Sequence, residues 1–279
     1  MMAHEIIHNE PLNYQDYLIK IRAPEVVKRI KPGQFVVMLL HEKGERIPMS
    51  VRRTEGDAVV MYIRKVGKTT SALIDKPVGD TILHVIGPQG TPLEIKKYGT
   101  VVVATDSVCG HAWSYSAAKA LKDAGNFVID IQSFADKEET YPEWALNKDA
   151  CNEHHLTTKD GSAGEKGHYI NLIKNWLENG KKIDLVLAGG ELIKLKRLER
   201  ITKKFNVPTW VEAHQLMIDA TGMCGVCRVF VDGEMKLTCI DGPFFDAHKL
   251  DFDSMINRYS TYANEEKLSL QLYKKQRGE

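Results

Sequence analysis

This sequence of 279 residues has almost no net charge, because 38 basic side chains are balanced by 37 acidic ones. The two signs are mixed along the chain, so neither a basic surface for nucleic acid nor a polybasic segment for anionic lipid is indicated. The longest apolar runs, such as FVVMLL and TVVVAT, are far shorter than the roughly 20 residues of a membrane-spanning helix. The first residues, MMAHEIIHNEPLN, lack the charged-then-apolar pattern of a secretion signal. We therefore predict a soluble, cytoplasmic protein.

Cysteine is also scarce, with five in the whole chain. Three of them, Cys224, Cys227 and Cys239, lie within one short segment, whereas Cys109 and Cys151 stand apart. Such a distribution does not resemble a disulfide framework, and a cluster of three indicates a metal site in a reducing compartment.

The apolar pattern changes along the chain and predicts several domains. In residues 1–97, short apolar stretches are broken by turn residues, and Val59, Met61 and Ile63 alternate within one stretch, which is typical of a small antiparallel β-barrel. In residues 98–213, buried-strand runs alternate with helical periodicity, which favours a parallel sheet with helices on both faces. Residues 214–250 form a cysteine module, and residues 251–279 form a polar, partly helical tail. The predicted fold class is multidomain, β plus α/β.

The cysteine module has a spacing that favours an iron–sulfur site. With Asp219 included, the segment reads D-x4-C-x2-C-x11-C. Plant-type two-iron ferredoxins use C-x4-C-x2-C and a distant fourth cysteine, so Asp219 stands where the first cysteine would be. Gly222 and Gly225 allow a tight loop whose N–H groups approach a cluster. Two alternatives remain open: a zinc site with the same residues, or Cys151 as the fourth ligand.

Two motifs in the predicted barrel favour a flavin. The first is ERIPMSV, where an arginine suits a pyrophosphate and Ser50 can donate its hydroxyl to a ring nitrogen. The second is YIRKVGKTTSAL, whose GKTT opens a predicted helix and offers N–H groups and hydroxyls to phosphate. Separately, the first motif fits a plain strand and the second an ordinary helix cap. The candidate cofactor-binding residues are Arg46, Pro48, Met49, Ser50, Tyr62, Ile63, Arg64, Gly67, Lys68, Thr69 and Thr70.

Over nearly its whole length the sequence resembles electron-transfer subunits of the ferredoxin–NADP reductase type. It is most similar to the small subunits of NADH-dependent ferredoxin:NADP oxidoreductases, and more distantly to the electron-transfer subunits of dihydroorotate dehydrogenase. The matching stretches are GERIPMSV, DGSAGEKG, IDLVLAGG and DATGMCGVCRVFVDGEMKLTCIDGPFFDAHKLDF. The resemblance implies FAD on the barrel, a nicotinamide nucleotide on the parallel sheet and a [2Fe-2S] cluster in the cysteine module. It also implies a larger flavoprotein or iron–sulfur partner subunit, with ferredoxin as a further candidate partner. The implied cluster ligands are Asp219, Cys224, Cys227 and Cys239.

One loop departs from that family pattern. Where the family has a glycine-rich G-G-G-x-G-x-A-P turn after the first parallel strand, this chain has ATDSVCGHAW. Gly110 alone remains, Asp106 adds negative charge near the expected phosphate, and Trp113 replaces a small residue. Binding of NAD(P)H is therefore uncertain. Two functions follow as hypotheses: a subunit that exchanges electrons with NAD(P)H, or an FAD/[2Fe-2S] adapter that has lost nicotinamide binding and only relays electrons between subunits. A non-redox scaffold that binds zinc is the third.

Two further features are predicted to have no chemical role. Cys109 lies in the altered loop, where a small buried side chain is a commoner role than a redox thiol. The segment NEHHLTT places His154 and His155 near Cys151, and we expect it to be a solvated connection and not a metal cluster.

Overall fold

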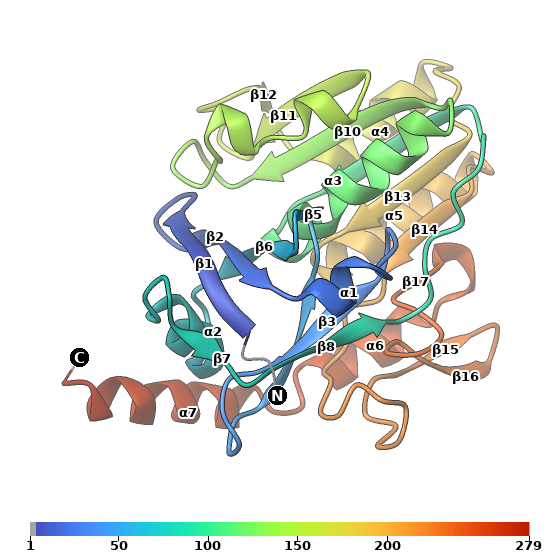
Figure 1. Ribbon diagram of the computed structural model, residues 1–279. Helices are drawn as coiled ribbons and strands as arrows, with labels where there is room; N and C mark the ends of the chain where they lie inside the picture. Colours follow the sequence, from blue (N-terminus) through green and yellow to red (C-terminus); the bar gives the residue numbers. More distant parts are fainter. Residues whose placement is uncertain (1–3, 279) are drawn as a thin grey trace.

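The computed structural model describes residues 4–278, so the first three residues and Glu279 lie outside the description. Its N-terminal part consists of two antiparallel sheets that face each other, drawn in blue to teal in Figure 1. The strand orders are β5-β6-β2-β1-β7 and β4-β3-β8. The elements are β1 (His4–Pro11), β2 (Asp16–Arg22), α1 (Pro24–Val27), β3 (Phe35–Leu39), β4 (Arg46–Ser50), β5 (Arg53–Glu55), β6 (Ala58–Arg64), α2 (Lys68–Ile74), β7 (Thr81–Ile82) and β8 (His84–Gln89).

Strand β6 is buried on both of its faces. The alternating set Val59, Met61 and Ile63 points into the barrel core, as the sequence predicts. The opposite set, Val60 and Tyr62, is also buried, against the first turns of α3 and a segment around Tyr141. Both faces are covered because the second domain packs directly onto this strand.

The second part is a seven-stranded sheet with the order β12-β11-β10-β9-β13-β14-β17, parallel except for β17. One face packs against α3, and the other packs against α4 and α5, so the predicted two-faced α/β layer is confirmed. The elements are β9 (Thr100–Thr105), α3 (Val108–Asp123), β10 (Phe127–Phe134), two single 3-10 turns (Glu143–Ala145 and Lys148–Ala150), β11 (Glu153–Thr158), β12 (Glu165–Lys166), α4 (Tyr169–Glu178), β13 (Leu185–Gly189), α5 (Leu192–Lys204) and β14 (Thr209–Glu212).

The segment NEHHLTT is not the solvated connection that the sequence suggested. It forms β11, which pairs in parallel with β10. The His154 side chain is only 7% exposed and lies 3.4 Å from the Asp130 carboxylate. The prediction was wrong because the backbone of residues 153–158 pairs along its whole length with β10 and so becomes part of the sheet.

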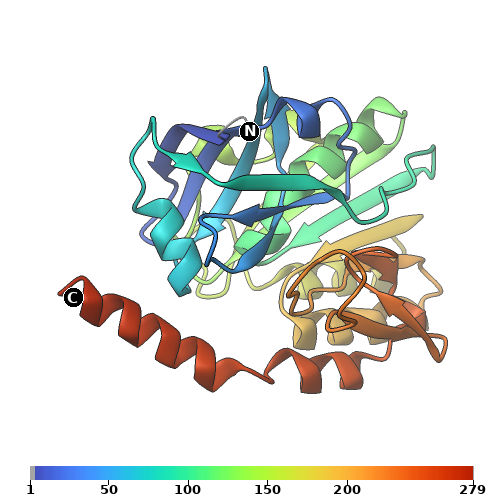
Figure 2. The same ribbon diagram turned by 60° about the horizontal axis from the view of Figure 1, so that its bottom comes forward.

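The cysteine module joins the other two parts. Its strand β17 (Phe244–Asp246) adds to the edge of the parallel sheet beside β14, while β15 (Arg228–Val231) and β16 (Glu234–Leu237) form a separate hairpin. A 3-10 turn (Ala247–Lys249), α6 (Phe252–Tyr259) and α7 (Ala263–Gln276) follow. Helix α7 runs beneath the barrel, where the Tyr273 hydroxyl lies 3.5 Å from Asp75 at the end of α2 (Figure 2). None of the helices in residues 4–278 is both long and apolar enough to span a membrane.

Candidate functional site

The cysteine loop, residues 217–227, contains three of the four predicted ligands, and the fourth is Cys239. Its tight path depends on left-handed backbone at Ala220, Gly222 and Gly225, with φ values of 56°, 84° and 65°. Helix α6 supports the loop, because the Arg258 guanidinium donates a hydrogen bond to the Val226 carbonyl at 2.9 Å.

The four predicted ligands form two pairs, Asp219 with Cys224 and Cys227 with Cys239. The Asp219 carboxylate accepts the N–H groups of Thr221 and Cys224 at 3.0 and 2.9 Å and also contacts the Cys224 thiol. The Thr221 and Cys224 bonds keep the Asp219 pKa below its usual value. The Cys239 thiol is hydrogen-bonded to the Cys227 thiol, and burial, followed by Cys227, raises the Cys239 pKa to about 12. The Cys239 thiol is therefore protonated at neutral pH when no metal is bound.

The other ligand candidates do not join this group. Cys151 lies in the core beside α3, where its thiol donates to the Asn147 carbonyl at 3.3 Å. Among residues 4–278, no three His, Cys, Asp or Glu side chains converge as they would around a single metal ion.

The cysteine loop packs directly on barrel strand β3. Cys227, Cys239 and Ala220 share one apolar cluster with Phe35 and Val37. Strand β3 is also the neighbour of β4, with Phe35 opposite Ser50 and Val37 opposite Pro48. The predicted cluster ligands and the predicted flavin strand are thus separated by one strand.

The two predicted flavin motifs lie next to each other at the start of β4. At its start, Glu45 receives a short hydrogen bond from the Thr69 hydroxyl and lies 3.7 Å from the Lys68 ammonium, so ERIPMSV and GKTT lie side by side. Arg46 is exposed beside them. As predicted, α2 begins directly after Gly67, where the Thr70 hydroxyl accepts the Gly67 N–H at 3.0 Å.

At its other end, β4 reaches the junction with the α/β domain. The Ser50 hydroxyl donates to Glu212 at 3.4 Å, and the Trp113 indole N–H donates to the second oxygen of the same carboxylate at 3.0 Å. Burial raises the Glu212 pKa to about 7, although both hydrogen bonds favour the charged form. Pro48 and Met49, between the two ends, are half-buried.

Three other predicted residues have their side chains engaged within the protein. Tyr62 is 3% exposed and donates its hydroxyl to the Ala145 carbonyl at 2.9 Å, while Ile63 lies in the barrel core. Arg64 makes a two-point ion pair with the fully buried Asp16, at 2.7 and 2.9 Å. These partners could not be predicted from the sequence, because they come from distant segments.

The segment ATDSVCGHAW, predicted to be an altered loop, forms the end of β9, a turn at Asp106 and Ser107, and the first turns of α3, and it is tightly packed. The Trp113 ring covers Gly189, where an added Cβ would lie 2.8 Å from the indole. His111 is buried, contacts the Thr105 hydroxyl at 2.8 Å, and has its pKa lowered to about 4 by burial. Cys109 is partly buried and packs against an apolar cluster that includes Phe134 and Tyr141, and burial raises its pKa to about 12, so the thiol is not activated.

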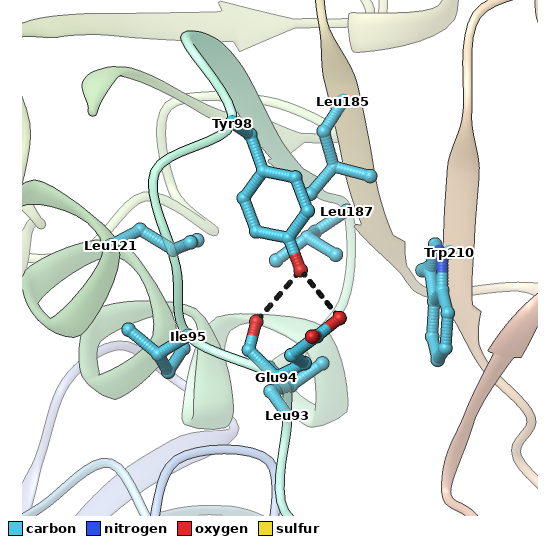
Figure 3. Close-up of a pocket in the computed structure, with 8 residues that line it drawn as sticks. All are labelled: Leu93, Glu94, Ile95, Tyr98, Leu121, Leu185, Leu187 and Trp210. Atoms are coloured by element: carbon cyan, nitrogen blue, oxygen red, sulfur yellow. Dashed lines mark hydrogen bonds between the residues drawn. The ribbon is translucent and has the colours of Figure 1, made fainter. Parts of the chain in front are cut away.

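A shallow apolar hollow lies elsewhere on the α/β domain (Figure 3). Its empty space is about 290 Å³, and part of that is open solvent. Its polar contacts are those of the Tyr98 hydroxyl with the Glu94 carbonyl and carboxylate, at 2.9 and 3.4 Å. Tyr98 and Leu185 mark the amino ends of β9 and β13, whereas nucleotides bind at the carboxyl ends of such strands.

Comparison with known proteins places this geometry in a family. Residues 214–251 match the iron–sulfur cluster binding domain of dihydroorotate dehydrogenase B. A Thermotoga maritima homologue of the electron transfer subunit of dihydroorotate dehydrogenase B (NAD(+)) is 41% identical over 263 residues, which cover 93% of this chain and 91% of that protein. The chain belongs to the family of dihydroorotate dehydrogenase B electron-transfer subunits and their homologues. It is an oxidoreductase subunit of the ferredoxin-reductase type.

Solved structures agree with this family assignment. A chain of the NADH-dependent reduced ferredoxin-NADP oxidoreductase, studied for flavin-based electron bifurcation, is 37% identical, covers 98% of both chains and has a TM-score of 0.90. The ferredoxin reductase of carbazole 1,9a-dioxygenase, 16% identical over 74% of this chain and 66% of that one, shares the fold with a TM-score of 0.58. The resemblance and fold class predicted from the sequence are both confirmed.

Proposed function

We propose that this subunit holds FAD along strand β4 and a [2Fe-2S] cluster in the cysteine loop, and passes electrons between them and a partner subunit. The proposed division is an FAD-binding barrel (1–97), a nucleotide-binding-like domain (98–213), a cluster module (214–250) and a helical tail (251–279). The observation that carries the proposal is the packing of Cys227 and Cys239 on β3, the strand that pairs with β4. The proposed flavin and cluster sites would then be separated by a single strand, and electron transfer requires such a short distance.

The barrel suits FAD at both ends of β4. At the Arg46 end, an exposed guanidinium, the opening of α2 and the hydroxyls of Thr69 and Thr70 would hold a pyrophosphate. Ser50 lies four residues further along, roughly 13 Å at about 3.3 Å per residue. Its hydroxyl would then face a flavin ring at the junction of the two domains. FAD supplies the ability to exchange electrons in pairs or singly.

The cysteine loop suits a two-iron cluster better than a single zinc ion. A [2Fe-2S] cluster takes two protein ligands on each iron, and the loop presents two pairs, Asp219 with Cys224 and Cys227 with Cys239. A zinc site needs four ligands converging at one point. The N–H groups around the loop would hydrogen-bond to the ligand atoms and adjust the reduction potential.

A second candidate, the adapter without nicotinamide binding, is favoured by the filled domain junction. Trp113 and Glu212 are 2% and 6% exposed and occupy the space beside Ser50. A nicotinamide ring would need that space to reach a flavin ring held at Ser50. We infer that electrons enter and leave this subunit through its partner. The partner is a larger flavoprotein or iron–sulfur subunit, with ferredoxin as a further electron carrier, and the five free cysteines suit the reducing cytoplasm.

An anaerobic absorption titration of the purified full chain tests this proposal. The starting spectrum must contain both flavin and [2Fe-2S] bands, and a colourless protein that contains zinc would refute the proposal. Addition of NADH and then NADPH separates the two candidates. Bleaching of the flavin band by either nucleotide would mean that the subunit exchanges electrons with nicotinamide directly. No bleaching, with dithionite still able to reduce both cofactors, is the result expected of an adapter.

A further inference from the structure

The crevice between the carboxyl ends of β9 and β13 is the switch point of the parallel sheet. From β9 the chain crosses to β10 on one side, and it later returns to β13 on the other. Sheets of this kind bind the phosphates of a nucleotide in that crevice, against bare glycine backbone and a helix N-terminus. Here the crevice is bounded by Asp106 after β9, Gly190 after β13, and the start of α5.

In this chain the crevice contains a carboxylate of the protein itself. The Asp106 side chain is 1% exposed and lies so close to Gly190 that an added Cβ there would fall 1.5 Å from Oδ1. The same oxygen accepts the N–H of Glu191, the N-cap residue of α5, at 3.3 Å. The Asp106 carboxylate thus lies against glycine backbone in the position that a phosphate takes in nucleotide-binding sheets.

Two basic side chains complete the surroundings of this carboxylate. The Lys194 ammonium of α5 lies 2.8 Å from Asp106 Oδ2, and His168 Nε2, at the start of α4, lies 2.9 Å from it. Burial alone would raise the Asp106 pKa, but the bonds from His168 and Lys194 outweigh burial and lower it. The Lys194 pKa is raised, because the Asp106 and Glu191 contacts outweigh its partial burial. The Lys194 ammonium at the crevice is therefore already neutralised by an internal anion.

We propose that Asp106 is an internal substitute for a phosphate group, which closes the switch-point crevice to dinucleotides. This inference rests on the proposed adapter function and names the residue that enforces it. Its consequence is specific: removal of the carboxylate leaves Lys194, His168, the Glu191 N–H and bare Gly190 around an empty anion site. A pyrophosphate-bearing ligand then binds there.

The test is calorimetric titration of the full chain with inorganic pyrophosphate and with ADP-ribose. Wild type should give no binding heat with either ligand at millimolar concentration. Asp106→Ser should bind at least tenfold more tightly than the weakest affinity that the titration of wild type could detect. The double variant Asp106→Ser with Lys194→Gln should lose most of that gain. The matched control is Asp123→Ser, which removes an exposed carboxylate paired with Lys119 at the end of α3 and should behave as wild type.

Asp106→Asn provides a second variant that keeps the shape of the side chain, in case the serine variant does not fold. The amide is neutral and still fills the crevice, so a smaller gain in affinity is expected. Two results would overturn the proposal: binding of pyrophosphate or ADP-ribose by wild type as tight as by the variants, or no gain in any folded variant. The absorption bands of flavin and cluster in the same samples report separately on the proposed function, so the two failures are distinguishable.

Discussion

Glu212 accepts a hydrogen bond from Ser50 of the barrel and another from Trp113 of α3, at 3.4 and 3.0 Å. One carboxylate at the end of β14 therefore connects the strand proposed to hold the flavin with the helix that follows the altered loop. It also lies one residue from Ala213, which leads into the cysteine module. All three parts of the subunit meet around this side chain, so its protonation state affects how they pack.

Glu212 should make the stability of the protein depend on pH. Its folded pKa of about 7 is above the usual value of 4.5, so between these pH values the folded state holds a proton that the unfolded state has lost. Its contribution to stability is therefore present below about pH 4.5 and is lost as pH rises toward 7, by roughly 3 kcal/mol. Glu212→Gln is neutral and should be more stable than wild type at pH 8 but not at pH 4.5. Urea unfolding at both pH values measures this difference, with the exposed Glu178→Gln as the control. Parallel pH profiles for wild type and Glu212→Gln would contradict the prediction.

Asp219→Cys should convert the cluster site to four thiolates. Because a thiolate donates more charge to iron than a carboxylate, we expect a changed visible spectrum and a shifted midpoint potential with two irons still bound. Redox titration followed by absorption and electron paramagnetic resonance measures both. Asp253→Cys, an exposed position on α6, is the control and should leave both unchanged. If Asp219→Cys matched wild type in spectrum and potential, Asp219 would not be a ligand.

The two glycines of the cysteine loop should differ in their tolerance of alanine. Both have positive φ, so each substitution strains the backbone by about 1 kcal/mol. A Cβ at Gly222 would also lie 2.9 Å from the Ile240 side chain, whereas at Gly225 it would meet nothing within 4 Å. We expect Gly222→Ala to lose bound iron during purification and Gly225→Ala to keep most of it, as measured by iron analysis. Equal iron content in the two variants would show that the Ile240 contact does not limit the loop.

Arg52 should be the largest single contributor to contact between the barrel and the α/β domain. It is fully buried, donates to Asn147 at 2.8 Å and to the Ala145 carbonyl at 2.9 Å, and lies over the Tyr62 ring. Arg52→Met leaves the buried Asn147 Oδ1 without a donor, at about 1–3 kcal/mol, whereas the Ala145 carbonyl keeps the Tyr62 hydroxyl. The neighbouring Arg53→Met removes a partly exposed ion pair with Glu55, worth less than about 1 kcal/mol, and a longer contact with the Tyr115 ring at 5.5 Å. Thermal unfolding of both variants checks the order, and equal losses would count against it.

Local sequence patterns were enough to predict the secondary-structure elements and the candidate cluster ligands. Turn residues and alternation predict the barrel strands, the change to helical periodicity predicts the α/β layer, and the spacing from Asp219 to Cys227 predicts a cluster loop. The start of α2 after Gly67 is equally predictable from the sequence, because it depends only on neighbouring residues. These features are local, so the order of residues along the chain is enough to specify them.

The contacts between those elements became visible in the folded structure alone. Asp106 reaches His168 and Lys194 across 62 and 88 residues of sequence (168 − 106 and 194 − 106), and Ser50 reaches Glu212 across 162. No periodicity predicts such pairs, because each depends on how elements that are distant in the sequence are placed side by side. The same holds for Tyr62 and Arg64, whose partners come from other segments, and for β11, which joins the sheet by pairing with β10. Local patterns fix which groups a chain offers, and long-range packing fixes which of them remain free to bind a ligand.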